Sequence, residues 1–169
     1  FGSDGDFSRW KFSMSDEVNL KLFGKLGYRI GVGGFIDNDL VQIPDYQHFN
    51  GNLSTLATEY LNSFQLLPLY LYSNTSRFFS LAHIEHNFHG LLTNKIPVVR
   101  KLNVYLVVGG NGFYMNRTDN YFELFAGIDN IFKRFRIDIV NAFKDGRFWK
   151  SAIRIGLTRL GETRGDDWP

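Results

Sequence analysis

Residues 122–129 of the chain read Phe-Glu-Leu-Phe-Ala-Gly-Ile-Asp. The apolar residues Phe122, Leu124, Ala126 and Ile128 occupy alternate positions, and Glu123, Phe125, Gly127 and Asp129 lie between them. Successive side chains of a β-strand point to opposite faces of its sheet. The stretch therefore predicts a strand with one apolar face and one face that carries charge.

The same alternation recurs in six other segments of the chain. They cover residues 10–20, 25–32, 78–89, 102–109, 134–139 and 153–158. We expect strands of roughly nine to fourteen residues, compared with about five or six in ordinary strands. A tilted strand needs about 9–11 residues to cross a bilayer, so these strands are long enough to span a membrane.

The composition agrees with an all-β chain. Aromatic residues make up 17% of the sequence, and 17 Gly accompany only 4 Pro, a mixture that favours strands and turns. No apolar run is long enough for a transmembrane helix. The net charge is +2 without a basic cluster, so we expect no nucleic-acid partner. The absence of Cys excludes disulfides and thiolate metal sites.

The two faces of the strands predict a transmembrane antiparallel β-barrel. In such a barrel the apolar face meets lipid and the polar face lines a wet lumen. The expected lipid-facing residues are Phe122, Leu124, Ile128, Ile137, Ile139, Ile153, Ile155 and Leu157. The expected lumen-lining residues are His83, Glu85, Asn87, His89, Glu123, Asp129, Arg134, Arg136, Asp138 and Arg154. A soluble barrel also alternates, but strand length, aromatic content and turn pattern favour the membrane.

The connections alternate between short and long, as they do in outer-membrane barrels. We expect the long loop 37–76 and the loops 116–120 and 144–148 outside the cell, and the remaining turns in the periplasm. Seven strands are too few, because such barrels begin at about eight. We therefore expect residues 1–160 to be the C-terminal part of a larger barrel, followed by a polar tail at 161–169. The first residues show no signal peptide, so an exported protein would begin upstream.

Several motifs occur in a fixed order around the long loop. They are Asp-Tyr-Gln-His-Phe-Asn-Gly-Asn at 45–52, Phe-Gln-Leu-Leu-Pro-Leu-Tyr at 64–70, His-Ile-Glu-His-Asn-Phe at 83–88, Asn-Lys-Ile-Pro at 94–97, Arg-Lys-Leu at 100–102 and Gly-Ile-Asp-Asn-Ile-Phe at 127–132. This succession resembles a Bacteroidota family of large outer-membrane proteins. Members of that family carry a carboxypeptidase-regulatory-like domain ahead of a barrel of unassigned function.

The pattern is also similar to the C-terminal half of the outer-membrane insertase and translocator superfamily. Barrels there have about sixteen strands, and a long loop after the eleventh folds back into the lumen. This resemblance implies that the loop residues Asp45, Tyr46, His48, Phe49, Asn50 and Gly51 form a lumen plug or gate. The chain departs from the superfamily where Asn50-Gly51-Asn52 replaces an Arg-Gly-aromatic tip, and where the final strand ends at Leu160 instead of an aromatic residue.

Other candidate chemistry has a simpler interpretation. His83, Glu85 and His89 would share one strand face, but alternate residues on a strand lie about 7 Å apart and do not converge on a metal. Polar lumen lining is the favoured interpretation, and we expect no metal and no cofactor. The glycine runs at 31–34 and 109–112 lack the Lys-Ser/Thr of a phosphate loop.

Two acidic residues of the polar face are expected to form ion pairs. Asp129 and Asp138 lie on neighbouring predicted strands, and Arg134, Arg136 and Arg154 are their candidate partners.

The sequence thus predicts a bacterial outer-membrane protein that is not an enzyme. Its expected role is structural, or in assembly or translocation, within a complex that handles exported proteins or lipoproteins. Its expected partners are outer-membrane lipid and the remainder of its own barrel or other outer-membrane subunits. One alternative is a soluble lipocalin-like barrel that binds a small apolar ligand. A further alternative is a membrane-embedded hydrolase that uses the histidine-rich strand at 83–89.

Overall fold

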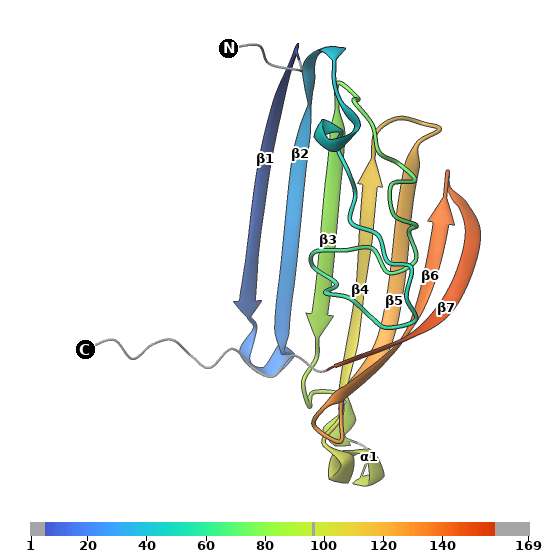
Figure 1. Cartoon of the computed structure of the whole chain (residues 1–169). Coiled ribbons are helices and arrows are strands. Elements are labelled where there is room, and N and C mark those ends of the chain that lie inside the picture. Colours follow the sequence, from blue (N-terminus) through green and yellow to red (C-terminus); the bar gives the residue numbers. More distant parts are fainter. Residues whose placement is uncertain (1–5, 96, 158–169) are drawn as a thin grey trace.

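The computed structural model of the chain describes residues 6–95 and 97–157. It contains one sheet of seven strands that follow one another in sequence order, each antiparallel to the next (Figure 1). The strands are β1 (Asp6–Asn19), β2 (Lys25–Leu40), β3 (Phe79–Asn87), β4 (Tyr105–Tyr114), β5 (Asn120–Ile131), β6 (Phe135–Lys144) and β7 (Arg147–Leu157). The predictions of an all-β chain and of an antiparallel sheet are confirmed. The N-terminal residues 1–5, Thr158, Leu160 and the tail 161–169 lie outside the described residues.

Several boundaries differ from those expected; the connection expected at 144–148, for example, is 145–146. Strand β2 continues to Leu40, so the long loop runs from 41 to 78 instead of 37 to 76. The segment predicted to begin a strand at Leu102 instead ends the short helix α1 (Pro97–Leu102). Asn103, at φ 52°, turns the chain from this helix into β4.

The connections divide between the two ends of the sheet. At one end lie the 3-10 turn η1 (Lys21–Phe23), the connection 88–104 with η3 (Thr93–Lys95) and α1, and the turn 132–134. At the other end lie the long loop, which contains η2 (Ile43–Asp45), and the connections after β4 and β6. Among the described residues, no helix combines the length and the apolar character needed to cross a membrane.

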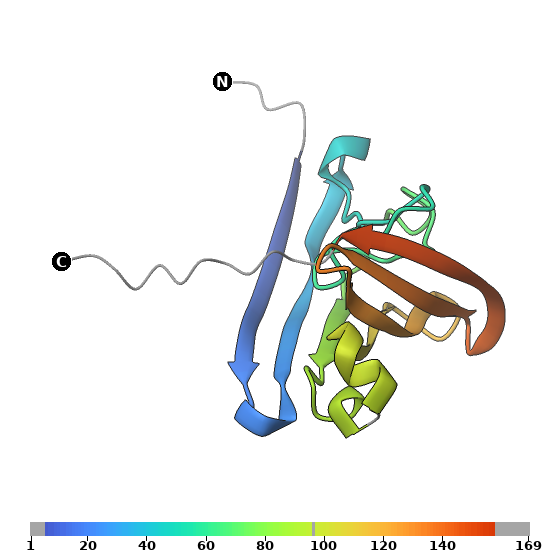
Figure 2. The same cartoon turned by 90° about the horizontal axis from the view of Figure 1, so that it is seen from below.

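The sheet is strongly curved but open. Seen from below, it forms an arc in which β6 and β7 bend towards the side that carries the long loop (Figure 2). Register shifts within the β5–β6 and β6–β7 ladders accompany this curvature, as bulges increase local bend and twist. Within the described residues β1 pairs only with β2, and β7 pairs along its length only with β6. The expected closed barrel is therefore not formed by these seven strands alone.

The two faces of the arc differ in composition and in burial. We call the face covered by the loop the concave face and the opposite face the convex face. Directly paired residues share a face, so the registers place Ile153, Ile139, Ala126 and Val108 in one convex row. All eight residues predicted to face lipid lie on the convex face.

Candidate functional site

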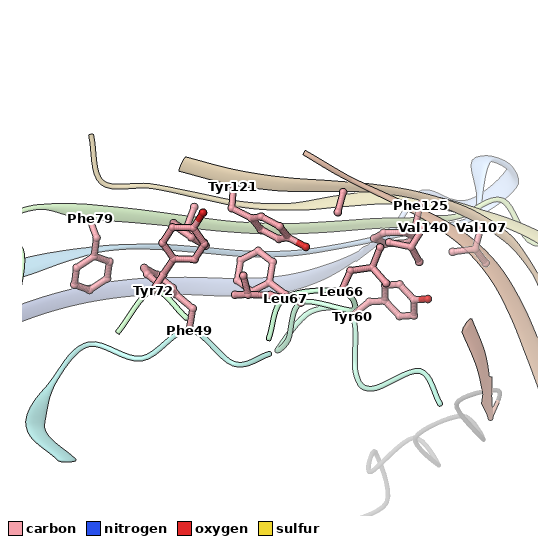
Figure 3. Packing of buried hydrophobic residues seen from close by; sticks show 13 residues of the cluster. Phe49, Tyr60, Leu66, Leu67, Tyr72, Phe79, Val107, Tyr121, Phe125 and Val140 are labelled. Carbon is pink, nitrogen blue, oxygen red and sulfur yellow. The ribbon is translucent and has the colours of Figure 1, made fainter. Parts of the chain in front are cut away.

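The long loop packs against the concave face through an aromatic and aliphatic core (Figure 3). Phe49 of the loop stacks on Phe113 of β4, with ring centroids 4.1 Å apart and planes 6° apart. Phe64 meets Phe113 and Tyr121 edge-on. Stacked and edge-to-face rings stabilise a contact by about 0.5–1.5 kcal/mol beyond their buried area. The loop is therefore part of the folded core and not a free surface segment.

The side chain of Glu123 in β5 binds the backbone of the long loop near its middle. This side chain is fully buried, and its two oxygens accept the backbone N–H groups of Gln65 at 2.7 Å and of Leu66 at 2.6 Å. The Tyr121 hydroxyl donates to the same carboxylate at 2.5 Å. Hydrogen bonds to an ionised acceptor are stronger than neutral ones, so one strand carboxylate fixes two consecutive loop peptides.

Arg154 of β7 binds the same loop residue from the other side. Its Nε and Nη2 both donate to the carbonyl oxygen of Gln65, at 2.9 and 2.6 Å. The peptide group of Gln65 is thus held at its N–H by an anion and at its carbonyl by a cation. We call Glu123, Tyr121 and Arg154 the peptide clamp. The clamp contacts only backbone groups of the loop, while the buried Gln65 side chain forms hydrogen bonds with Thr58 and Ser63 inside the loop.

A second polar group holds Tyr60 of the loop. Its hydroxyl donates to Asp138 of β6 at 2.9 Å, and the Arg136 guanidinium lies over its ring, 4.2 Å from the centroid. Arg136 also pairs with Asp138 at 2.8 Å and with Glu85 of β3 at 2.6 Å. Burial, followed by the charge of Asp138, raises the pKa of the Tyr60 phenol above its ordinary value. The phenol therefore stays protonated and can keep donating to Asp138.

A glycine makes room for this group. A Cβ atom at Gly127 would lie 2.2 Å from Oδ1 of Asp138 and 2.4 Å from the Ile137 carbonyl oxygen. Both distances are shorter than any real contact of a Cβ atom, so a larger residue at this position would displace the carboxylate that binds Tyr60.

The loop also touches the outer edge of the sheet. The Ala57 N–H donates to the Ile155 carbonyl at 2.8 Å, and the Ile155 N–H donates to the Thr55 carbonyl at 3.4 Å. These bonds form a parallel bridge between Leu56 and Ile155 of β7. A sheet edge otherwise presents unpaired backbone groups, so this short segment covers the edge of β7 at one residue.

The residues predicted to line the lumen separate into two groups. Eight of them lie on the concave face, namely His83, Glu85, Asn87, Glu123, Asp129, Arg136, Asp138 and Arg154. His89 and Arg134 lie in turns beyond the strand ends. Among the described residues, no group of three or more His, Asp or Glu side chains is placed to hold a metal ion.

One of the candidate ion pairs is confirmed. Asp138 pairs with Arg136, as expected. Arg154 donates to the loop carbonyl of Gln65 instead of to a strand carboxylate, because the loop reaches the concave face at that point. Asp129 accepts a hydrogen bond from Asn87 at 3.4 Å.

The predicted loop motif at 45–51 organises the loop itself. His48 bonds the Ser73 hydroxyl at 2.7 Å, and the Asn50 side chain donates to the Asn62 carbonyl at 3.0 Å. Asp45 and Tyr46 lie in and after η2, and Gly51 lies against the Leu67 carbonyl, where a Cβ atom would clash. Only Phe49 of this motif belongs to the buried core with the sheet.

Within the predicted motif, the Asp45 carbonyl accepts a hydrogen bond from Arg9 of β1 at 3.1 Å. The hydrogen bonds that the loop donates to Glu123 and Asp138 come from three residues outside the motif at 45–51. These are Tyr60, Gln65 and Leu66. Two of them contribute backbone groups, which leave no signature in a sequence. Tyr60 is an isolated aromatic in a long loop, and its partner Asp138 lies 78 residues away.

The chain was compared with known protein families, curated proteins and solved structures. Residues 1–128 match the model described as the C-terminal domain of a family of unknown function (DUF5686). No match is found among curated proteins or among solved structures. The family model covers β1 to β4, the long loop and most of β5. The chain therefore belongs to this family of unknown function.

Proposed function

We propose that this chain is a section of the wall of a transmembrane β-barrel in a bacterial outer membrane. In this proposal the convex face meets lipid, the concave face lines the lumen, and the long loop is a plug held by the peptide clamp. The role is structural, or in assembly or translocation, within a larger outer-membrane complex that handles exported proteins or lipoproteins. No catalytic role is proposed.

The convex face is the observation that carries the proposal. In the paired rows of β2 to β7, the convex positions hold no Asp, Glu, Lys or Arg. Large apolar side chains at these positions are exposed, and Leu124, near the middle of β5, is 53% exposed. Soluble monomers rarely expose a continuous apolar surface of this extent. Lipid covers such a face without a partner protein, and lipid contact explains why the apolar side chains are on the outside of the arc.

The open edge of the sheet at β1 supports the proposal that the chain is part of a larger barrel. Strand β1 has 14 residues, and its outer edge carries no ladder among the described residues. Backbone groups without partners cost several kcal/mol each in a hydrocarbon medium. We therefore propose that another strand pairs with β1, supplied by the remainder of the same barrel or by another outer-membrane subunit.

The position of the loop supports the relation to the insertase and translocator superfamily. Five strands, β3 to β7, follow the loop, as they do in barrels of about sixteen strands in that superfamily. The proposed Bacteroidota origin and the assembly or translocation role rest on the resemblance carried by the motifs described above. In this chain the peptide clamp would replace the salt bridge that the superfamily forms at its Arg-containing loop tip.

Membrane fractionation of the intact native protein tests the proposal. The protein should partition with the outer membrane, require detergent for extraction, and migrate faster on a gel before boiling than after. Its intact mass should be well above the 19.5 kDa of this chain. A water-soluble species of 19.5 kDa that does not shift on boiling would contradict the proposal. That result would favour a soluble barrel that binds an apolar ligand.

A further inference from the structure

The connections at one end of the sheet have an unusual charge composition. The segments 20–24, 88–104 and 132–134 contain no Asp or Glu. Their basic residues, which we call the basic rim, are Lys21, Lys95, Arg100, Lys101, Lys133 and Arg134. The described members of this set are exposed. The connections at the opposite end contain Asp45, Glu59, Asp119 and Asp145 beside Arg77 and Arg117. Only one end of the sheet is therefore purely basic.

Large apolar side chains stand next to the bases of this rim. Leu22 and Phe132 are each 82% exposed, and Phe23 and Leu102 are also exposed. Each lies within two residues of a basic residue in the sequence. Exposed single apolar residues need no explanation, but here the same combination recurs in three separate turns. The recurrence indicates a surface that contacts something both apolar and anionic.

The backbone conformation of the turn between β5 and β6 is unusual for the residues that occupy it. Phe132 and Lys133 have φ angles of 50° and 64°, and the Arg134 N–H closes the turn on the Ile131 carbonyl at 3.1 Å. Two successive positive φ angles in a tight hairpin are the conformation for which Asn-Gly is preferred. A bulky aromatic and a lysine in this conformation are strained, which points to a function for their side chains.

Side-chain hydrogen bonds fix the first turn to the sheet and the connection 88–104 to the end of β5. The His86 ring bonds the Phe23 carbonyl at 2.9 Å, which ties the first turn to β3. The Asn130 side chain donates to the Asn103 carbonyl at 2.6 Å, which ties the end of β5 to the connection that contains α1. The basic and apolar residues therefore lie on connections that are gathered at one end of the sheet (Figure 1).

We propose that the basic rim binds the head groups of anionic phospholipids in the membrane leaflet at this end of the barrel. This inference rests on the proposed function. Lysine and arginine attract anionic head groups, and aromatic and leucine side chains insert at the boundary between head groups and acyl chains. Three separate turns with the same chemistry fit a continuous lipid layer better than one protein partner. The rim also adjoins the convex face, which the proposed function already places in lipid.

Electron spin resonance with spin-labelled lipids tests this inference on the intact protein. The protein is inserted into phosphatidylcholine vesicles, and the association of spin-labelled phosphatidylglycerol is compared with that of phosphatidylcholine. We expect a preference for phosphatidylglycerol of about fivefold or more, which high salt weakens. The combined variant Lys101→Gln, Lys133→Gln, Arg134→Gln should lose most of this preference. The control variant Arg77→Gln, Arg117→Gln, at the opposite end, should keep it.

A second variant separates lipid binding from stability. Phe132→Asn with Lys133→Gly gives the turn its preferred residues, so it should stabilise the protein while it lowers the preference for phosphatidylglycerol. Equal association of both lipids with the unaltered protein would overturn the inference, as would an unchanged preference in both rim variants. Failure to insert into any bilayer would instead contradict the proposed function. A third outcome is that the unaltered protein shows no lipid preference but binds an acidic soluble protein, and that the rim variants lose this binding. That result would make the rim a protein-binding surface and overturn the inference.

Discussion

The concave and convex faces of the sheet are built from alternate residues of the same strands but have opposite surroundings. Glu123 is 0% exposed, whereas its neighbour Leu124 is 53% exposed. The concave face buries Asp138, Arg136 and Arg154, while the convex face exposes aliphatic side chains. The covered face thus buries charged groups beside its aromatic core, whereas in a soluble sheet the apolar face is covered and the polar face meets water.

This burial of charge is possible because the loop satisfies the charged groups. Glu123 accepts hydrogen bonds from backbone N–H groups of the loop, and Arg154 donates to a loop carbonyl. Asp138 forms an ion pair with Arg136 and accepts a hydrogen bond from Tyr60. Buried charges are tolerated only when they are paired and hydrogen-bonded. Among residues 6–95 and 97–157, no loop covers the convex face in the same way, and in the proposed function lipid accepts this apolar surface. A substitution on one face should therefore change the free energy of unfolding by a different amount from the same kind of substitution on the other face.

The largest effect is expected from the loss of the clamp carboxylate. Glu123→Leu leaves the N–H groups of Gln65 and Leu66 and the Tyr121 hydroxyl without their acceptor. We expect the free energy of unfolding to fall by roughly 4 kcal/mol, because each buried unpaired group costs about 1–3 kcal/mol. Urea unfolding of the intact protein in vesicles measures this change. Glu123→Gln keeps one acceptor oxygen and should lose clearly less, and equal losses in the two variants would contradict the clamp.

A charge placed on the convex face should have the next largest effect. Leu124→Arg is expected to cost about 2–4 kcal/mol in a bilayer, the range for arginine on the lipid face at the midplane. Ser13→Arg is the matched control, because Ser13 lies on the uncovered part of the concave face, opposite Gly31. The same urea titration compares the two variants. A similar loss of unfolding free energy in both variants would contradict the proposal that only the convex face meets lipid.

Removal of a single loop contact should have a smaller effect. Tyr60→Phe deletes the hydroxyl that donates to Asp138 but keeps the ring beneath Arg136. We expect a loss of about 1.5 kcal/mol, typical of a hydrogen bond to a charged group. Tyr60→Leu, which also removes the ring, should lose more. Limited proteolysis of the loop and urea unfolding would detect both changes, and no loss in Tyr60→Leu would show that this contact does not hold the loop.

The bridge at the edge of β7 should contribute least. Ala57→Pro removes the N–H that donates to the Ile155 carbonyl, for an expected loss of about 1 kcal/mol. Hydrogen exchange at the Ile155 amide should become faster, because the bond to Thr55 weakens with it. Ala57→Ser keeps the N–H and serves as control. Unchanged exchange at Ile155 in the proline variant would mean that the loop does not cover this edge.

The sequence predicted the strands and their faces because alternation is a local property. The register places every expected lipid-facing residue, from Phe122 to Leu157, on the convex face. The helix α1 was missed because Leu102 and Val104 continue the apolar alternation of β4 backwards, while the turn at Asn103 depends on a positive φ angle. Contact of the convex face with lipid stays a prediction.

The clamp could not be predicted in the same way. Arg154 and Gln65 lie 89 residues apart, and Gln65 and Leu66 contribute backbone atoms that any residue would supply. Complementary charges on neighbouring strands, such as Arg136 and Asp138, can be found from alternation. When a carboxylate binds the backbone of a loop, its partner can be any loop residue, so the sequence does not indicate which residue it binds. Arg154 was one of three candidate partners for the strand carboxylates, and it binds the loop carbonyl of Gln65.

Site-directed spin labelling tests the surroundings of the two faces most directly. The chain contains no Cys, so single cysteines can be introduced in the intact, membrane-inserted protein at Ile30, Leu124 and Ile139 on the convex face and at Ser13 and Ser15 on the concave face. Labels at the convex positions should be accessible to oxygen, which concentrates in lipid, and shielded from a water-soluble nickel complex. Labels at the concave positions should show the reverse. Strong access of the nickel complex to the convex positions would contradict the account.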